Sequence, residues 1–280
     1  MSRDARIASF VDLERYPIDN PDSPQGRSFV NRMREQLRTE GLCQLPGFLT
    51  EEAVTQLIRE ADAVEPQAYF GLTEATPYFN NPDPACATDH PRNTRTRRDL
   101  GLIASDLMAD DCELKALYEW PPLRSFLSSI LSQGRLYTLD DPYQKHCFTV
   151  MPQGAGHNWH FDDANFTVTL MLRKPAEGGD FECVPNLRTA RDENYPGVRE
   201  VLNGRRDNVQ VISFEPGTLM IFRGRYSLHR VSPVTSPWSR VIAIFQYSTE
   251  PGWTGTPLTN ELVFGPRVAI SRSPSTTGRP

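Results

Sequence analysis

In the second half of the chain, helical spacing of the apolar residues gives way to strict alternation. Residues 166–172 read FTVTLML, so Phe166, Val168 and Leu170 fall on one face of an extended strand. Further short strands are predicted at 181–184, 209–214, 218–222, 227–231 and 240–247, with turns at Gly178-Gly179 and Pro216-Gly217. Short strands that follow one another without intervening helices favour a jelly roll.

The first half of the chain is expected to be helical and irregular. Apolar residues at helical spacing, from Phe29 to Leu37, lead to Gly41, which ends the segment, and a short strand and turn follow over 42–49. Thr50 is suited to cap a helix that ends before Pro66. Two more helices are predicted over 111–120 and 122–131. Residues 67–99 show no period and are rich in Pro, Asn, Asp and Thr, so we expect a long excursion that forms a lid or substrate wall.

The length of 280 residues fits a single domain. We divide it into a mostly helical and loop part (1–134), a β core (135–250) and a C-terminal loop and flexible tail (251–280), with disorder expected from Ser271. The 30 basic and 35 acidic residues form no long run of like charge, so we do not expect a nucleic-acid partner. The oligomeric state stays open.

Compartment and redox state are inferred from what the composition lacks. The first thirty residues contain no apolar stretch long enough for a signal peptide or a membrane span, so we expect a cytoplasmic protein with no membrane partner. The five cysteines are widely spaced and form no C-x-x-C, which favours reduced, buried thiols over a disulfide framework. These residues are Cys43, Cys86, Cys112, Cys147 and Cys183.

Two histidines and one carboxylate have the spacing of a metal site. His160 and Asp162 are separated by one residue and therefore point to the same face of a strand. His229 opens a later strand, at a place where it would line the same barrel mouth. An H-x-D pair alone is weak evidence, and a lone histidine is more often structural. Two His and one carboxylate together form the facial triad of non-haem Fe(II) oxygenases, which leaves the opposite face of the metal open.

Arg240 lies eleven residues after His229 and begins a strand. Alternation places it on one face with Ile242, Ile244 and Gln246, an otherwise apolar wall. A buried, unpaired arginine would be costly, so an anionic partner is implied, and a guanidinium binds a carboxylate through two parallel N–H groups. The distal carboxylate of 2-oxoglutarate fits this requirement. The alternative is an exposed arginine at a strand start.

At this point the chain resembles the Fe(II)/2-oxoglutarate-dependent oxygenase superfamily over roughly residues 140–250. The resemblance implies a double-stranded β-helix (jelly roll, cupin-like), mainly β with flanking helices and a helical N-terminal part. It also implies three cofactors and cosubstrates, Fe(II), 2-oxoglutarate and O₂, with succinate and CO₂ as coproducts. The enzyme would abstract hydrogen from an unactivated C–H bond.

Four segments are similar to a narrower subgroup, the lysine radical halogenases and their hydroxylating relatives, which act on free amino acids. These segments are WHFD at 159–162, GGDFE at 178–182, DEN at 192–194 and FRGRYSLHRV at 222–231. The halogenases of this subgroup have Gly where this chain has Asp162, because halide needs the vacated position. The resemblance therefore implies hydroxylation, with desaturation or ring closure as further outcomes of the same chemistry, in secondary metabolism.

Four residues are candidates for holding an amino-acid substrate. Asp163 matches a residue that contacts the substrate amine in the resembling halogenases, but it also fits a solvated loop acid. His157 fits a loop histidine or a substrate contact. Of the cluster Arg95, Arg97 and Arg98, we choose Arg98 for an α-carboxylate. Trp253 closes the pocket in one interpretation and packs under a C-terminal loop in the other.

Two alternatives compete with an amino-acid oxygenase. The first keeps the chemistry but changes the substrate to a carrier-tethered or other small molecule. The second is a jelly-roll protein that binds a metal without oxidising anything. Arg240 argues against the second, because metal storage needs no carboxylate clamp.

Overall fold

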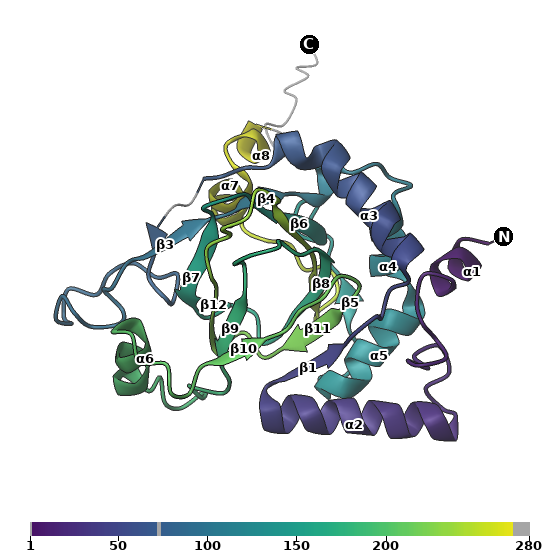
Figure 1. Ribbon diagram of the computed structural model, residues 1–280, viewed down its shortest axis with the longest axis horizontal. Coiled ribbons are helices and arrows are strands. Elements are labelled where there is room, and N and C mark those ends of the chain that lie inside the picture. The colour runs from purple at the N-terminus through teal and green to yellow at the C-terminus, as the bar shows by residue number, and fades with distance from the viewer. Residues whose placement is uncertain (1, 72–73, 271–280) are drawn as a thin grey trace, which may run out of the picture.

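Two six-stranded antiparallel sheets face each other and form the centre of the molecule (Figure 1). The computed structural model describes residues 2–71 and 74–270. One sheet has the order β1 (Leu42–Leu45), β11 (Leu219–Phe222), β8 (Thr167–Arg173), β13 (Arg240–Phe245), β6 (His146–Met151) and β4 (Gly101–Ile103). The other has the order β10 (Gln210–Ile212), β9 (Phe181–Val184), β12 (Leu228–Val231), β7 (Gly156–His160), β3 (Thr96–Asp99) and β2 (Glu74–Ala75). A two-stranded pair joins β5 (Tyr137–Thr138) to β14 (Tyr247–Ser248).

Alternation along β13 decides what lies between the sheets. Arg240, Ile242 and Ile244 line an interior cavity, whereas the intervening residues join the large core on the other face of the sheet. That core lies against the helices, and Figure 1 shows α2 to α5 on one side of the strands and α6 on the other. The prediction that Arg240 faces inward on an apolar wall is confirmed, since Arg240 is only 1% exposed.

The helices begin and end where the local sequence indicates. Ser23 caps α2 (Pro24–Glu40), and Gly41 ends it in the left-handed conformation, while Thr50 caps α3 (Glu51–Val64). The remaining helices are α1 (Arg3–Ala8), α4 (Glu113–Glu119), α5 (Pro121–Leu131), α6 (Tyr195–Leu202), α7 (Pro257–Phe264) and α8 (Arg267–Ile270), with short 3-10 turns η1 (Glu65–Gln67) and η2 (Ser105–Leu107). The mainly β fold with flanking helices and the helical N-terminal part are as predicted.

The structure corrects two sequence-based expectations. Helix α6 interrupts the strand series between β9 and β10, because Asn194 caps it and Pro196 occupies its first turn. Residues 251–270 are not a loop throughout, since they contain α7 and α8. Thr256 caps α7, and the buried Asn260 on that helix donates to the carboxylate of Asp141 at 2.8 Å. The disorder expected from Ser271 lies outside the described residues.

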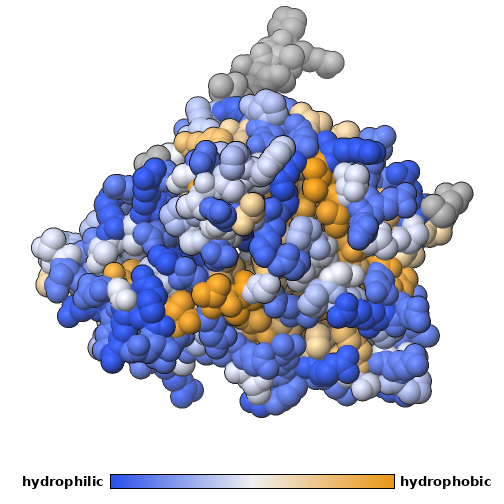
Figure 2. Space-filling view, in the orientation of Figure 1, coloured by the Kyte–Doolittle hydropathy of each residue, from blue (hydrophilic) through white to orange (hydrophobic). Residues whose placement is uncertain are grey.

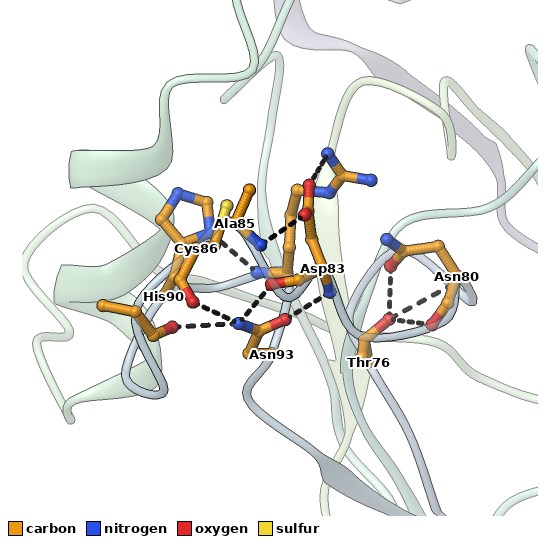
Figure 3. Close-up of polar contacts among 9 residues, drawn as sticks. Thr76, Asn80, Asp83, Ala85, Cys86, His90 and Asn93 are labelled. Carbon is orange, nitrogen blue, oxygen red and sulfur yellow. Dashed lines mark hydrogen bonds and ion pairs between the residues drawn. The ribbon is translucent and has the colours of Figure 1, made fainter.

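The excursion over residues 67–99 is mostly irregular, as predicted, but it ends in β3, which joins the second sheet. A polar knot holds it together (Figure 3). The side-chain amide of Asn93 donates to the carbonyls of Asp83, Cys86 and Ala87, and its oxygen accepts from the backbone N–H of Asp83. The part of the excursion between Asp83 and Asn93 is thereby held in one defined conformation.

The surface and the cysteines agree with a reduced globular protein. On the face shown in Figure 2, hydrophilic side chains predominate and apolar ones gather in short strips. All five cysteines are free, and four of them are buried. Among the described residues, none of the helices combines the length and the apolar character needed to cross a membrane.

Candidate metal centre

His160, Asp162 and His229 converge as the sequence predicted. His160 ends β7 and His229 lies in β12, and the two residues are direct partners across these strands. The Nε2 atoms of His160 and His229 lie 3.7 and 3.4 Å from Oδ1 of Asp162. One ligand atom from each of the three residues lies within 4.8 Å of the others, so a single ion can bind all three.

Backbone carbonyls orient both imidazoles. Nδ1 of His160 donates to the carbonyl of Asn158 at 2.7 Å, and Nδ1 of His229 donates to the carbonyl of Ser227 at 2.9 Å. Each Nδ1 is therefore held by the main chain, and each Nε2 faces Asp162, where a neutral ring would present it to a metal ion. Burial also lowers the pKa of His160 well below its usual range, so the ring is neutral at physiological pH.

Asp162 is ionised in this setting. Burial alone would raise its pKa, but the positive charge that His229 and His160 would carry when protonated, together with the hydrogen bond from the Thr167 hydroxyl, lowers it below the usual range. Two neutral nitrogen donors and one anionic oxygen on the same side of a position form a donor set that fits Fe(II). The residues present thus match the metal that the sequence implied.

A cavity of about 130 Å³ connects this centre to Arg240. Its walls are mainly apolar, and both sheets contribute to them, with Phe181 and Val231 from one and Met220 and Ile242 from the other. Burial lowers the pKa of Arg240 to about 10, partly offset by Asp180. Among the described residues, Nε of Arg240 has no hydrogen-bond partner. A buried cation in this state requires an anion.

Two threonines that line the same cavity as Arg240 were missed by the sequence reasoning. Thr149 on β6 and Thr169 on β8 are the cross-strand partners of Ile242 and Ile244 and line the same cavity. Their hydroxyls are buried and, within the described part of the chain, lack a hydrogen-bond partner. In the sequence, each threonine lies on the inward face of an otherwise apolar strand. This pattern is only a weak sign of a binding role, because threonine is common in strands.

Of the four substrate candidates, two lie beside the metal centre. His157 stacks on His160 with ring centroids 3.5 Å apart, and Arg98 is its partner across β3 and β7. Both line the cavity, and burial lowers the pKa of Arg98 to about 10. Asp163 is exposed and does not line the cavity, although its carbonyl accepts from Arg225 at 2.8 Å. Trp253 is 38% exposed and also lies outside the cavity lining.

Phe79 is a further neighbour that the sequence did not indicate. Its ring lies edge-on to His160 with centroids 5.5 Å apart, and its backbone has a φ of 53°, a conformation that aromatic residues rarely adopt. The carbonyl of Pro77 accepts from the backbone N–H of Phe161 at 2.8 Å. The excursion is thus anchored at Phe161, between His160 and Asp162.

The fold is that of non-haem, α-ketoglutarate (2-oxoglutarate)-dependent enzymes. AviO1 from Streptomyces viridochromogenes superposes with a TM-score of 0.53 at 15% identity, covering 81% of this chain and 97% of that one. The epimerase SnoN from nogalamycin biosynthesis has a TM-score of 0.53 at 13% identity (79% and 83% covered). The carbocyclase SnoK from the same biosynthesis has 0.53 at 14% (77% and 83%).

Within this fold, the chain belongs to the Halogenase D family. The model of that family matches residues 84–262, which is more than half of the chain and includes the three metal-centre residues and Arg240. No curated protein matches the chain. The predicted fold is therefore confirmed, and the matched family is one of halogenases.

Proposed function

We propose that this chain is a single catalytic domain, an Fe(II)- and 2-oxoglutarate-dependent oxygenase that hydroxylates an unactivated C–H bond of a free amino acid or a close derivative in secondary metabolism. In this proposal, the two facing sheets would form the double-stranded β-helix that is typical of such enzymes. One observation carries the proposal. The His160, Asp162 and His229 donors and the buried guanidinium of Arg240 line the same small cavity.

Each residue has a defined task in this proposal. Fe(II) would be held by His160, Asp162 and His229. With 2-oxoglutarate it would activate O₂ for attack on an unactivated C–H bond. Arg240 would bind the distal carboxylate of 2-oxoglutarate through parallel N–H groups, with the hydroxyls of Thr149 and Thr169 as further donors. The apolar walls exclude water from the reacting groups.

Hydroxylation is favoured over halogenation despite the name of the family. Asp162 provides a carboxylate at the position where the resembling halogenases have Gly, and its Oδ1 faces both histidines. A carboxylate there occupies the place that a halide would take. Desaturation and ring closure stay as alternative outcomes, and SnoK is a carbocyclase with a similar fold.

The small volume of the cavity and the polar groups near the metal centre support an amino-acid substrate. His157 and Arg98 bring an imidazole and a cation to the cavity wall, which suits a carboxylate-bearing molecule. A carrier-tethered or other small molecule is the alternative with the same chemistry. A metal-binding protein without catalysis is the second alternative, and the buried Arg240 argues against it.

Two measurements test the proposal in sequence. Anaerobic addition of Fe(II) and 2-oxoglutarate should produce a visible charge-transfer band, because the cosubstrate chelates the metal. With O₂ admitted, one member of a panel of free amino acids should raise succinate formation and gain the mass of one oxygen atom. Absence of the band refutes the oxygenase, whereas a band without a response to any amino acid redirects the search to other small molecules.

A further inference from the structure

The two carboxylate oxygens of Asp162 have different surroundings. Oδ1 faces Nε2 of His160 and of His229 at 3.7 and 3.4 Å. Oδ2 points the other way and accepts a hydrogen bond from the hydroxyl of Thr167. The backbone N–H of Asp162 donates to the carbonyl of Gly224 at 3.1 Å, which fixes the main chain beside the carboxylate.

Gly224 closes the space behind the same carboxylate. A Cβ atom at this position would lie 2.0 Å from Oδ2 and 2.7 Å from Cγ of Asp162, far inside van der Waals contact. Gly224 is not among the glycines with positive φ, so its backbone conformation does not require glycine. The requirement comes from the position of the Asp162 side chain alone.

From these contacts, we infer that Thr167 and Gly224 are positioning residues that present Asp162 to the metal through one oxygen only. This inference rests on the metal site of the proposed function. A carboxylate with two free oxygens can rotate and bind an ion through both, as many do. Here the Thr167 hydroxyl donates a hydrogen bond to Oδ2, and the Gly224 backbone leaves no room for the carboxylate to move away from the metal. Asp162 therefore binds through Oδ1 alone and takes one coordination position. Three protein donors then leave three positions for cosubstrate and O₂.

The first test removes the hydroxyl and keeps the shape of the side chain. In Thr167→Val, the affinity for Co(II) or Fe(II), titrated anaerobically without 2-oxoglutarate, should fall about 10- to 100-fold, the usual effect of losing a partner of a metal ligand. Thr167→Ser should restore it. The visible bands of bound Co(II) should also change in intensity, because the freed carboxylate binds through both oxygens.

Thr218→Val is the matched control. Thr218 is buried and directly precedes β11, it lies outside the cavity lining, and no hydrogen bond joins it to Asp162 among the described contacts. Its metal affinity should equal that of the wild type. Thermal unfolding of the metal-free proteins accompanies each titration, so that a folding defect is recognised as such.

The second test is a double-mutant cycle. Gly224→Ala should lower metal affinity at least as much as Thr167→Val, because the new methyl group displaces Asp162. In an Asp162→Gly background the same alanine meets no carboxylate, so it should cause no further loss of metal affinity or of thermal stability. Equal effects of Gly224→Ala in both backgrounds would overturn the role assigned to Gly224.

The inference and the proposed function fail in different ways. Unchanged metal affinity and Co(II) bands in a folded Thr167→Val protein overturn the role of Thr167, even if the enzyme turns over 2-oxoglutarate. An equal loss in Thr218→Val does the same. Conversely, suppose that Co(II) affinity depends on Thr167 as predicted while the wild-type protein never consumes 2-oxoglutarate. That result would refute the oxygenase proposal but not the inference.

Discussion

Replacement of Arg240 by methionine should have opposite effects on stability and on cosubstrate binding. The side chain is 1% exposed, and its pKa is lowered to about 10 from 12.5, mainly by burial. That difference corresponds to roughly 3 kcal/mol of unfavourable burial of the charge. Methionine fills most of the same volume without a charge. The ligand-free variant should therefore be more stable than the wild type.

The size of the gain follows from the same figures. If half of the cost is recovered, the free energy of unfolding rises by about 1.5 kcal/mol, which is a Tm increase of about 3–6 °C for a chain of this size. Arginine is charged in both the folded and the unfolded chain below about pH 10, so the penalty is fully present there and fades only as pH rises from about 10 toward 12.5. The Tm gain should thus be constant between pH 6 and 9.

Cosubstrate binding should change in the other direction. Hydrogen bonds to charged groups contribute about 1.5–3 kcal/mol each, and the guanidinium fork makes two, so 2-oxoglutarate affinity should fall at least about 100-fold. In the wild type, 2-oxoglutarate at 100 times its Kd adds about 2.7 kcal/mol of stability, and the variant should lose this increment.

The assay is thermal unfolding of the Mn(II)-loaded protein with and without 2-oxoglutarate, together with titration of the anaerobic charge-transfer band. Arg267→Met is the control, since Arg267 is paired at the surface with Asp106 and should leave cosubstrate binding unchanged. A variant of Arg240 that is less stable without ligand and binds 2-oxoglutarate within threefold of the wild type would refute the reasoning.

Three further predictions concern other parts of the molecule. Asp162→Gly should abolish hydroxylation, as seen by product mass, and unchanged turnover would show that the carboxylate ligand is misassigned. His146 is buried, and burial lowers its pKa to about 3. As pH falls below about 6.5, the unfolded chain therefore binds a proton at His146 while the folded chain does not, and the free energy of unfolding decreases. His146→Leu should therefore weaken the acid loss of stability by roughly 3 kcal/mol in chemical denaturation at pH 4 relative to pH 7, and an unaltered pH profile would contradict this account. Asn93→Ala removes three bonds to carbonyls, so limited proteolysis should cut the excursion between residues 83 and 93 faster than in the wild type, and equal cutting rates would argue against the knot.

The metal-centre geometry was accessible from sequence because it depends on strand alternation. The period of two along β13 turned Arg240 inward, as expected. The i, i+2 spacing brought His160 and Asp162 together as well, although Asp162 lies two residues past the end of β7 and not on the strand itself. His229 followed from its place at the start of a strand, although its pairing with His160 depends on strand order, which the sequence does not encode locally. Local periodicity therefore found the ligands but not the partners that orient them.

The parts that the sequence did not reveal depend on contacts between distant segments. Thr167 acts on Asp162 from the beginning of the following strand, and the roles of Thr149 and Thr169 depend on the register of β6 and β8 beside β13. The excursion has no sequence period, and side-chain bonds such as those of Asn93 hold part of it, so nothing local predicted that Phe79 would lie against His160. Trp253 was placed by resemblance alone, and the structure leaves it outside the cavity lining.

The two sheets have different roles at the site, and Thr167 connects them. His160 and His229 belong to one sheet and are paired across neighbouring strands, so their relative position is fixed by backbone hydrogen bonds. Arg240 belongs to the opposite sheet, as does Thr167 at the start of β8. The bond from Thr167 to Asp162 therefore spans the gap between the sheets at the metal end of the cavity. A change in sheet separation would move the Asp162 carboxylate before it moved the histidine pair, so the carboxylate is the ligand whose position depends on the packing of the whole core.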